Sequence, residues 1–189
     1  MLKGYVLPVV ALALGAHCAA APLAFSLRDT RGAAHTAAEW RGDKAVVLFF
    51  VTTDCPVANS YVPEMNRIRD AYAGRGVGVY AVQADASVTA AEAAKYAEEY
   101  RYRFPLLVDA EQVLVKWTGA TITPQAAVLS ADGRVLYLGR IDNRVADFGK
   151  ARQSATSEDL RIALDAVLAG RAVPVPRTKS IGCAINLRK

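Results

Sequence analysis

The chain contains the run Phe49-Phe50-Val51-Thr52-Thr53-Asp54-Cys55-Pro56-Val57-Ala58-Asn59, in which a cysteine separates two kinds of secondary structure. The apolar residues of 45–51 are typical of a buried strand, and the residues after Pro56 are typical of a helix that begins with proline. Cys55 is therefore predicted at a helix N-terminus, where unpaired N–H groups and the helix dipole favour the thiolate. This placement predicts redox or nucleophilic chemistry by a sulfur that solvent can reach.

The composition indicates one globular domain. The chain has 189 residues, of which 53% are hydrophobic and 22% charged, enough for a sizeable core. The formal net charge is +5, but the arginines are scattered singly among acidic and apolar residues. Because there is no basic block, we expect no binding to nucleic acid.

The first twenty residues are typical of a secretory signal peptide. Lys3 precedes a short apolar stretch, and small residues around Ala20 suit cleavage there. The stretch is too short to span a bilayer comfortably. Lipid attachment at Cys18 is the less favoured alternative, because His17 is not the small residue that precedes such sites. We therefore expect a periplasmic or secreted protein that does not span a membrane.

The cysteine count points to a pair of thiols. Cys18 leaves with the signal peptide at 1–20, and Cys55 and Cys183 remain. Two cysteines in an exported protein can pair with each other. Together with His35 they show no metal-ligand spacing, so neither a metal nor another cofactor is predicted.

Hydrophobic periodicity predicts alternating strands and helices in a domain at 21–189 with a tail at 171–189. Strands are predicted at 24–27, 44–51, 77–84, 106–108, 125–130 and 134–141. Helices are predicted at 56–73, kinked at Pro63, at 89–102, at 111–117 and from 156–159 to Gly170, with a loop at 143–154. This order predicts an α/β fold with a central mixed sheet flanked by helices.

Four sequence features match one family pattern. They are the Thr52 to Pro56 motif around the cysteine, Pro63 in the following helix, Thr123-Pro124 before a strand, and the 137–142 strand combined with a late Gly182-Cys183. Over residues 23–185 the chain resembles the thioredoxin-like superfamily, specifically its redoxin or peroxiredoxin-like (AhpC/TSA-type) branch.

The resemblance implies roles for particular residues. Cys55 would be the reactive thiol, and a cis Thr123-Pro124 peptide would face it and shape a substrate groove. Thr123, Pro56 and Arg140 are the predicted substrate-binding residues. Thr52 would donate its hydroxyl to the sulfur, although a threonine before a turn is also ordinary in strands.

Cys183 has two interpretations. As a resolving thiol, it requires the tail to fold back over the domain, and as a spare cysteine it would sit on a loose tail. Several basic residues nearby are expected to favour its thiolate, namely Arg177, Lys179, Arg188 and Lys189.

The sequence also departs from the family pattern. Ala58 stands where thioredoxins have a second cysteine, Phe49 where they have a buried acid, and Leu48 where peroxiredoxins have a proline. The arginine with which peroxiredoxins bind peroxide is missing from the strand after Pro124, and Arg140 is a candidate replacement. The Asp54 carboxylate opposes a neighbouring thiolate. Because the chain departs from both the thioredoxin and the peroxiredoxin patterns, a peroxide and a disulfide are both candidate oxidants.

The favoured hypothesis is an exported thiol oxidoreductase. The Cys55 thiolate would attack a protein disulfide or a peroxide, Cys183 or a partner's thiol would resolve the intermediate, and a thiol reductant would regenerate the protein. One alternative is a non-catalytic thioredoxin-like binding module that partners a haem or copper redox protein. Another is a metal chaperone, which the shortage of ligands disfavours.

Overall fold

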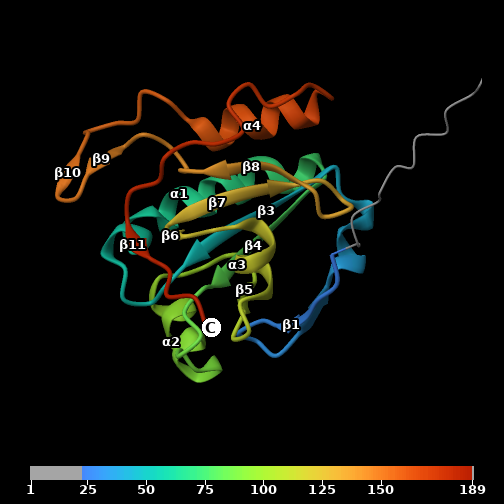
Figure 1. Cartoon of the computed structure of the whole chain (residues 1–189), viewed down its shortest axis with the longest axis vertical. Coiled ribbons are helices and arrows are strands. Elements are labelled where there is room, and N and C mark those ends of the chain that lie inside the picture. Colours follow the sequence, from blue (N-terminus) through green and yellow to red (C-terminus); the bar gives the residue numbers. More distant parts are fainter. Residues whose placement is uncertain (1–22, 189) are drawn as a thin grey trace, which may run out of the picture.

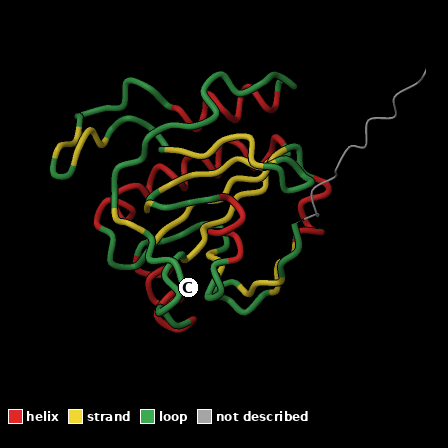
Figure 2. The backbone as a smooth tube through the Cα atoms, in the orientation of Figure 1, coloured by secondary structure: helices red, strands yellow, loops and turns green. Residues whose placement is uncertain are grey.

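The computed structural model describes residues 23–188, so the predicted signal peptide lies outside the described part of the chain. A five-stranded sheet with the order β5-β4-β3-β7-β8 forms the centre (Figure 2). Its strands are β3 (Ala45–Val51), β4 (Val77–Gln83), β5 (Leu106–Val108), β7 (Gln125–Leu129) and β8 (Val135–Gly139). β3, β4 and β5 are parallel, whereas β7 is antiparallel to both β3 and β8. The predicted mixed sheet is confirmed.

β3 is the central strand, and all seven of its residues are fully buried. Because successive side chains of a strand point to opposite faces, Val47, Phe49 and Val51 enter one hydrophobic cluster while Leu48 and Phe50 enter another. A strand buried on both faces needs an apolar residue at every position, which explains the unbroken apolar run.

Helices cover both faces of the sheet (Figure 1). One cluster receives side chains from α1 (Pro56–Tyr72), α2 (Ala90–Glu99) and α4 (Asp159–Leu168). The other receives Trp40 of the 3-10 helix η1 (Ala37–Gly42) and residues of α3 (Val113–Thr118). This confirms the predicted arrangement of a sheet flanked by helices.

The helix boundaries differ in detail from those predicted. α1 runs on through Pro63 to Tyr72. α2 ends at Glu99, before Arg101 adopts a left-handed φ of 57°. α3 starts after Gln112, whose φ of 55° is also left-handed and so does not continue a right-handed helix.

Short strand pairs complete the fold. They are β1 (Ser26–Arg28) with β2 (Ala34–Thr36), β6 (Ile122–Thr123) with β11 (Cys183–Ala184), and β9 (Val145–Asp147) with β10 (Lys150–Ala151). A further 3-10 turn, η2 (Ala73–Arg75), follows α1. The predicted loop at 143–154 is wrong, because β9 and β10 form a hairpin that projects from the body (Figure 1). Most residues of this hairpin are exposed, so it carries no hydrophobic alternation.

Candidate active site

Cys55 occupies the N-cap of α1, directly after the polar residues that end β3. Pro56 is the first helical residue, and the Cys55 sulfur accepts a hydrogen bond from the Ala58 N–H at 3.5 Å. The position predicted from the strand–proline–helix pattern is thus confirmed. The N-cap side chain accepts a free N–H group of the first helical turn. Because this side chain is a thiol rather than a hydroxyl, the N–H group points at sulfur.

The Thr123–Pro124 loop faces this sulfur. Its peptide bond is cis, as the resemblance implied. The Cys55 thiol donates a hydrogen bond to the Thr123 carbonyl oxygen at 3.0 Å, and the hydroxyls of Thr52 and Thr123 lie 3.2 Å apart. Thr52 therefore braces the loop through Thr123, and the loop in turn contacts the sulfur.

β11 brings Cys183 to the same place. This strand pairs antiparallel with β6, with Cys183 opposite Thr123 and Ala184 opposite Ile122. The Cys183 thiol lies close enough to the Cys55 thiol for the interaction to raise its pKa, and both cysteines are free thiols. The tail folds back over the domain beside β6 (Figure 1), as the resolving role of Cys183 requires.

Cys55 is fully buried, with an exposed fraction of 0%, so the prediction that solvent reaches its sulfur is wrong. The sulfur is not sealed away from the loop, however, because it contacts Thr123 and Cys183 directly. Cys183 itself is half-buried. In the reduced protein the tail thus covers the thiol that the helix N-terminus holds.

The expected electrostatic effect on Cys183 is also wrong. Burial, followed by the hydrogen bond to Cys55 and the charges of Cys55 and Asp54, raises the pKa of Cys183 to about 12. The basic residues do not offset these causes. The Arg188 guanidinium instead bonds Glu111 at 2.8 Å, and Lys189 lies outside the described residues. Cys183 therefore remains a thiol at neutral pH.

Arg140 lies near the Thr123–Pro124 loop, but its guanidinium is already paired with a carboxylate. It lines a small hollow with Pro124, Tyr61 and Ile181. Its Nε and Nη2 donate to the two carboxylate oxygens of Asp159 at 2.8 and 3.1 Å. This bidentate pair raises the pKa of the Arg140 guanidinium. The role of Arg140 in binding substrate stays a prediction.

Sequence reasoning missed a polar network that holds the Cys55 loop. The Asn59 side chain donates to the Thr53 carbonyl at 3.5 Å and to the Tyr100 hydroxyl at 3.0 Å, and it accepts from the Tyr96 hydroxyl at 2.8 Å. Burial is the main cause that raises the pKa of Tyr96 to about 12. The only sequence signal was Asn59 one helical turn after Cys55, and its tyrosine partners come from a distant segment.

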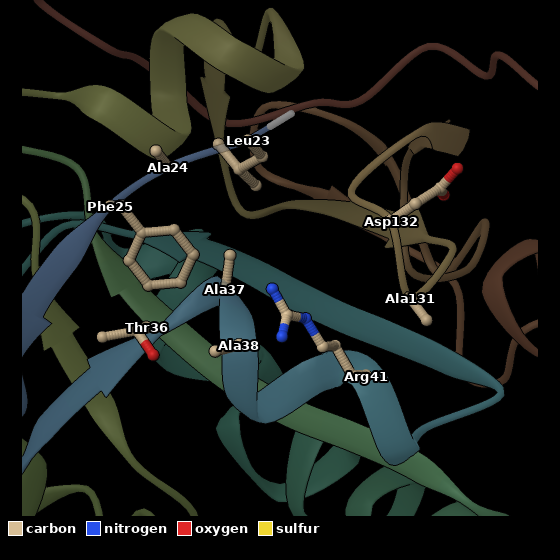
Figure 3. Close-up of a pocket in the computed structure, with 9 residues that line it drawn as sticks. All are labelled: Leu23, Ala24, Phe25, Thr36, Ala37, Ala38, Arg41, Ala131 and Asp132. Atoms are coloured by element: carbon tan, nitrogen blue, oxygen red, sulfur yellow. The ribbon is translucent and has the colours of Figure 1, made fainter. Parts of the chain in front are cut away.

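A much larger hollow than the one beside Arg140 lies elsewhere. Its volume is about 600 Å³, and Figure 3 shows its lining residues, which are Leu23, Ala24, Phe25, Thr36, Ala37, Ala38, Arg41, Ala131 and Asp132. Ala131 and Asp132 follow β7, whose Leu129 pairs with Val46 at the start of β3. The hollow therefore lies at the opposite end of β3 from Cys55, and none of the predicted site residues lines it.

Residues 23–188 contain no cluster of three His, Cys, Asp or Glu side chains able to hold a metal ion. Within the same part of the chain, no helix has the length and apolar character needed to cross a membrane.

A mixed sheet, a cysteine at the N-cap after its central strand and a cis-proline loop facing the sulfur together define a thioredoxin-like protein. The model of the AhpC/TSA family matches residues 19–138, and the chain belongs to this family. The family resemblance inferred from the sequence is confirmed.

The chain is also similar to curated relatives and to solved structures. The chain is 29% identical over 111 residues to the thiol-disulfide oxidoreductase ResA of Geobacillus thermodenitrificans, a match that covers 59% of this chain and 62% of that one. A hypothetical protein from Sinorhizobium meliloti is 30% identical with a TM-score of 0.74, covering 87% of this chain and 91% of its own. An uncharacterized conserved protein from Geobacillus kaustophilus is 27% identical with the same TM-score, covering 89% and 91%.

Proposed function

We propose that the protein is an exported thiol oxidoreductase in which Cys55 and Cys183 alternate between a dithiol and a disulfide. The observation that carries this proposal is the contact between the two thiols, made where β11 pairs with β6 beside the cis-proline loop. Membership of the AhpC/TSA family and the name of the ResA relatives support the same chemistry. Disulfides persist in oxidising compartments, which suits a periplasmic or secreted protein with a signal peptide at 1–20.

The proposed reaction with a protein disulfide has two steps. When the tail lifts, the Cys55 thiolate attacks one sulfur of the substrate disulfide, forms a mixed disulfide and releases the other sulfur as a thiolate. Cys183 then loses its proton and attacks the Cys55 sulfur, so that the Cys55–Cys183 disulfide forms and the second substrate thiol leaves. A thiol reductant supplies two electrons to restore the dithiol.

The raised pKa of Cys183 fits this order. The charge on Cys55 is one cause of the shift, and that charge disappears when the Cys55 sulfur becomes part of a mixed disulfide. Cys183 therefore ionises more readily at the stage where it must attack. Thr52, Thr123 and Pro124 would hold the loop against the substrate, and Pro56 would begin the helix without a competing N–H group.

A peroxide substrate would follow a parallel course. Cys55 would become a sulfenic acid with release of water or an alcohol, and Cys183 would displace a second water to form the same disulfide. Because the Arg140 guanidinium is hydrogen-bonded to both carboxylate oxygens of Asp159, it is less free to bind a peroxide. A protein disulfide is therefore the favoured substrate class.

Trapping with oxidised glutathione tests the proposal. The Cys183→Ser variant should accumulate a mixed disulfide at Cys55, whereas the wild type should pass on to the internal disulfide. The Cys55→Ser variant is the matched control and should form no internal bond. If peptide mass spectrometry finds Cys55 unmodified in the Cys183→Ser variant at any glutathione concentration, the proposal fails.

One observation favours a second candidate function. The complete burial of Cys55 suits a non-catalytic thioredoxin-like module that partners a haem or copper redox protein. In that case a Cys55→Ser strain should retain full activity of the dependent redox protein. Loss of that activity would exclude the module and support a reactive Cys55.

A further inference from the structure

Gln112 is a buried polar residue that neither the family pattern nor the proposed chemistry uses. Its exposed fraction is 0%, and its φ of 55° is left-handed. A non-glycine residue rarely adopts this conformation unless its surroundings hold it there. The contacts of its side chain show what holds it.

The Gln112 amide joins the end of β4 to the tail. Its Nε2 donates to the carbonyl oxygens of Ala84 and Asn186, each at 2.8 Å. Its Oε1 accepts from the Arg188 backbone N–H at 2.7 Å. Both amide hydrogens and the carbonyl oxygen are thus used, and two of the three bonds go to the tail.

These bonds fix the tail on one side of Cys183, and a separate group of bonds fixes it on the other. Upstream, the Thr178 hydroxyl bonds the Tyr137 hydroxyl at 2.7 Å and accepts from the Arg140 N–H at 3.0 Å. Downstream, the Ile185 N–H donates to the Thr121 carbonyl at 2.8 Å before the chain reaches Gln112. Cys183 therefore lies on a span that is held at both ends.

We propose that Gln112 is a positioning residue that latches the tail, keeping the Cys183 thiol against Cys55 and closing Cys55 to other reagents. The inference rests on the proposed function, because it gives the contact of the two thiols a catalytic purpose. The latch raises the effective concentration of Cys183 at Cys55. It also makes access to Cys55 depend on how often the tail lifts.

Gln112 also bonds Ala84, so a purely structural role must be separated from the latch. Arg188→Pro removes the N–H that Gln112 accepts and leaves the Gln112–Ala84 bond in place. Arg188→Ala is the matched control, because it keeps that N–H and removes only the guanidinium contacts. Gln112→Asn suits a left-handed φ but is too short to span both partners.

The test is the rate at which iodoacetamide alkylates Cys55 in the reduced full-length protein, mapped by peptide mass spectrometry. Since a fully buried thiol reacts only after the tail lifts, each lost hydrogen bond should raise the rate directly. We expect an increase of about fivefold for Arg188→Pro and about tenfold or more for Gln112→Asn. Arg188→Ala should stay within about twofold of the wild type.

A second arm follows the reaction of the protein dithiol with oxidised glutathione to give the protein disulfide and two reduced glutathiones. The latch variants should accumulate more of the mixed disulfide between Cys55 and glutathione than the wild type and Arg188→Ala, because Cys183 is held less closely and resolves it more slowly. Unchanged alkylation of Cys55 in both latch variants would overturn the inference. A wild type that forms no disulfide would instead overturn the proposed function, while the alkylation arm would still decide whether Gln112 controls access.

Discussion

Cys55 and Cys183 lie in different environments although their thiols are close enough to interact. Cys55 is fully buried at the N-cap of α1 and receives the Ala58 N–H, whereas Cys183 is half-buried on β11. When two ionisable groups interact, a negative charge on one disfavours ionisation of the other. At the scale of the residue, the interaction with Cys55 is one cause that raises the pKa of Cys183.

The coupling predicts the effect of removing one thiol. In Cys55→Ala, the hydrogen bond and the charge that raise the pKa of Cys183 are gone, so this pKa should fall below about 12. It should stay above the usual thiol value, because burial, the largest cause, remains. Ultraviolet absorbance of the thiolate against pH measures the change, and an unaltered pKa would show that Cys55 contributes nothing.

The tyrosine network behind Cys55 gives a prediction for stability. In Tyr96→Phe, the bonds of the hydroxyl to Asn59 at 2.8 Å and to Tyr102 at 3.1 Å are lost, and Asn59 loses a buried donor. We expect a loss of about 1–3 kcal/mol in the free energy of unfolding, since a buried polar group is left unsatisfied. Urea unfolding measures this loss. Stability equal to that of the wild type would mean that the network does not hold the Cys55 loop.

At the scale of the element, the pairing of β11 with β6 depends on Gly182. A Cβ atom at this position would clash with the Thr123 carbonyl oxygen. Because that oxygen belongs to the backbone of the paired strand, it cannot move aside as a flexible side chain would. The two strands can therefore approach only because residue 182 lacks a side chain.

Gly182→Ala should separate β11 from β6. We expect the docked tail to be destabilised by about 1–3 kcal/mol, with less internal disulfide at a given glutathione ratio. Gly74→Ala is the matched control, because a Cβ there meets nothing within 4 Å. The amount of disulfide by mass spectrometry measures the effect, and equal amounts in the two variants would contradict the role of this close approach.

Local sequence signals predicted the strand, the N-cap cysteine and the helix of the β3–α1 unit, because each follows from neighbouring residues. The cis peptide before Pro124 followed from the family resemblance. The burial of Cys55 was missed because its cover, β11, is a two-residue strand that pairs far along the chain. Such a pairing leaves no periodicity in the sequence, and neither do the long-range partners of Gln112.

At the scale of the whole molecule, the tail runs from the edge strand β8 to the end of β4. Thr178 is bonded beside β8, and Asn186 and Arg188 are bonded to Gln112 next to the end of β4. Figure 1 shows the tail leaving α4 and passing β11, and Arg188 is bonded to Ala110, Glu111 and Gln112, just before α3. The candidate active site thus combines residues of the β3–α1 junction with residues of the tail.

Export is the prediction that concerns the whole chain. Protein recovered from the periplasm or medium should begin at Ala21, because cleavage is predicted after Ala20. Intact mass measures this directly. A mass that includes Met1 would contradict the signal peptide, and an acylated form beginning at Cys18 would establish the lipoprotein alternative.

The central claim is that Cys55 and Cys183 form one redox pair. The most direct measurement is to reduce the wild-type protein, oxidise it with a slight excess of oxidised glutathione, and map its disulfides by mass spectrometry without reduction. The account predicts a single internal bond between Cys55 and Cys183, which dithiothreitol reverses. Recovery of Cys55 as a free thiol under these conditions would contradict it.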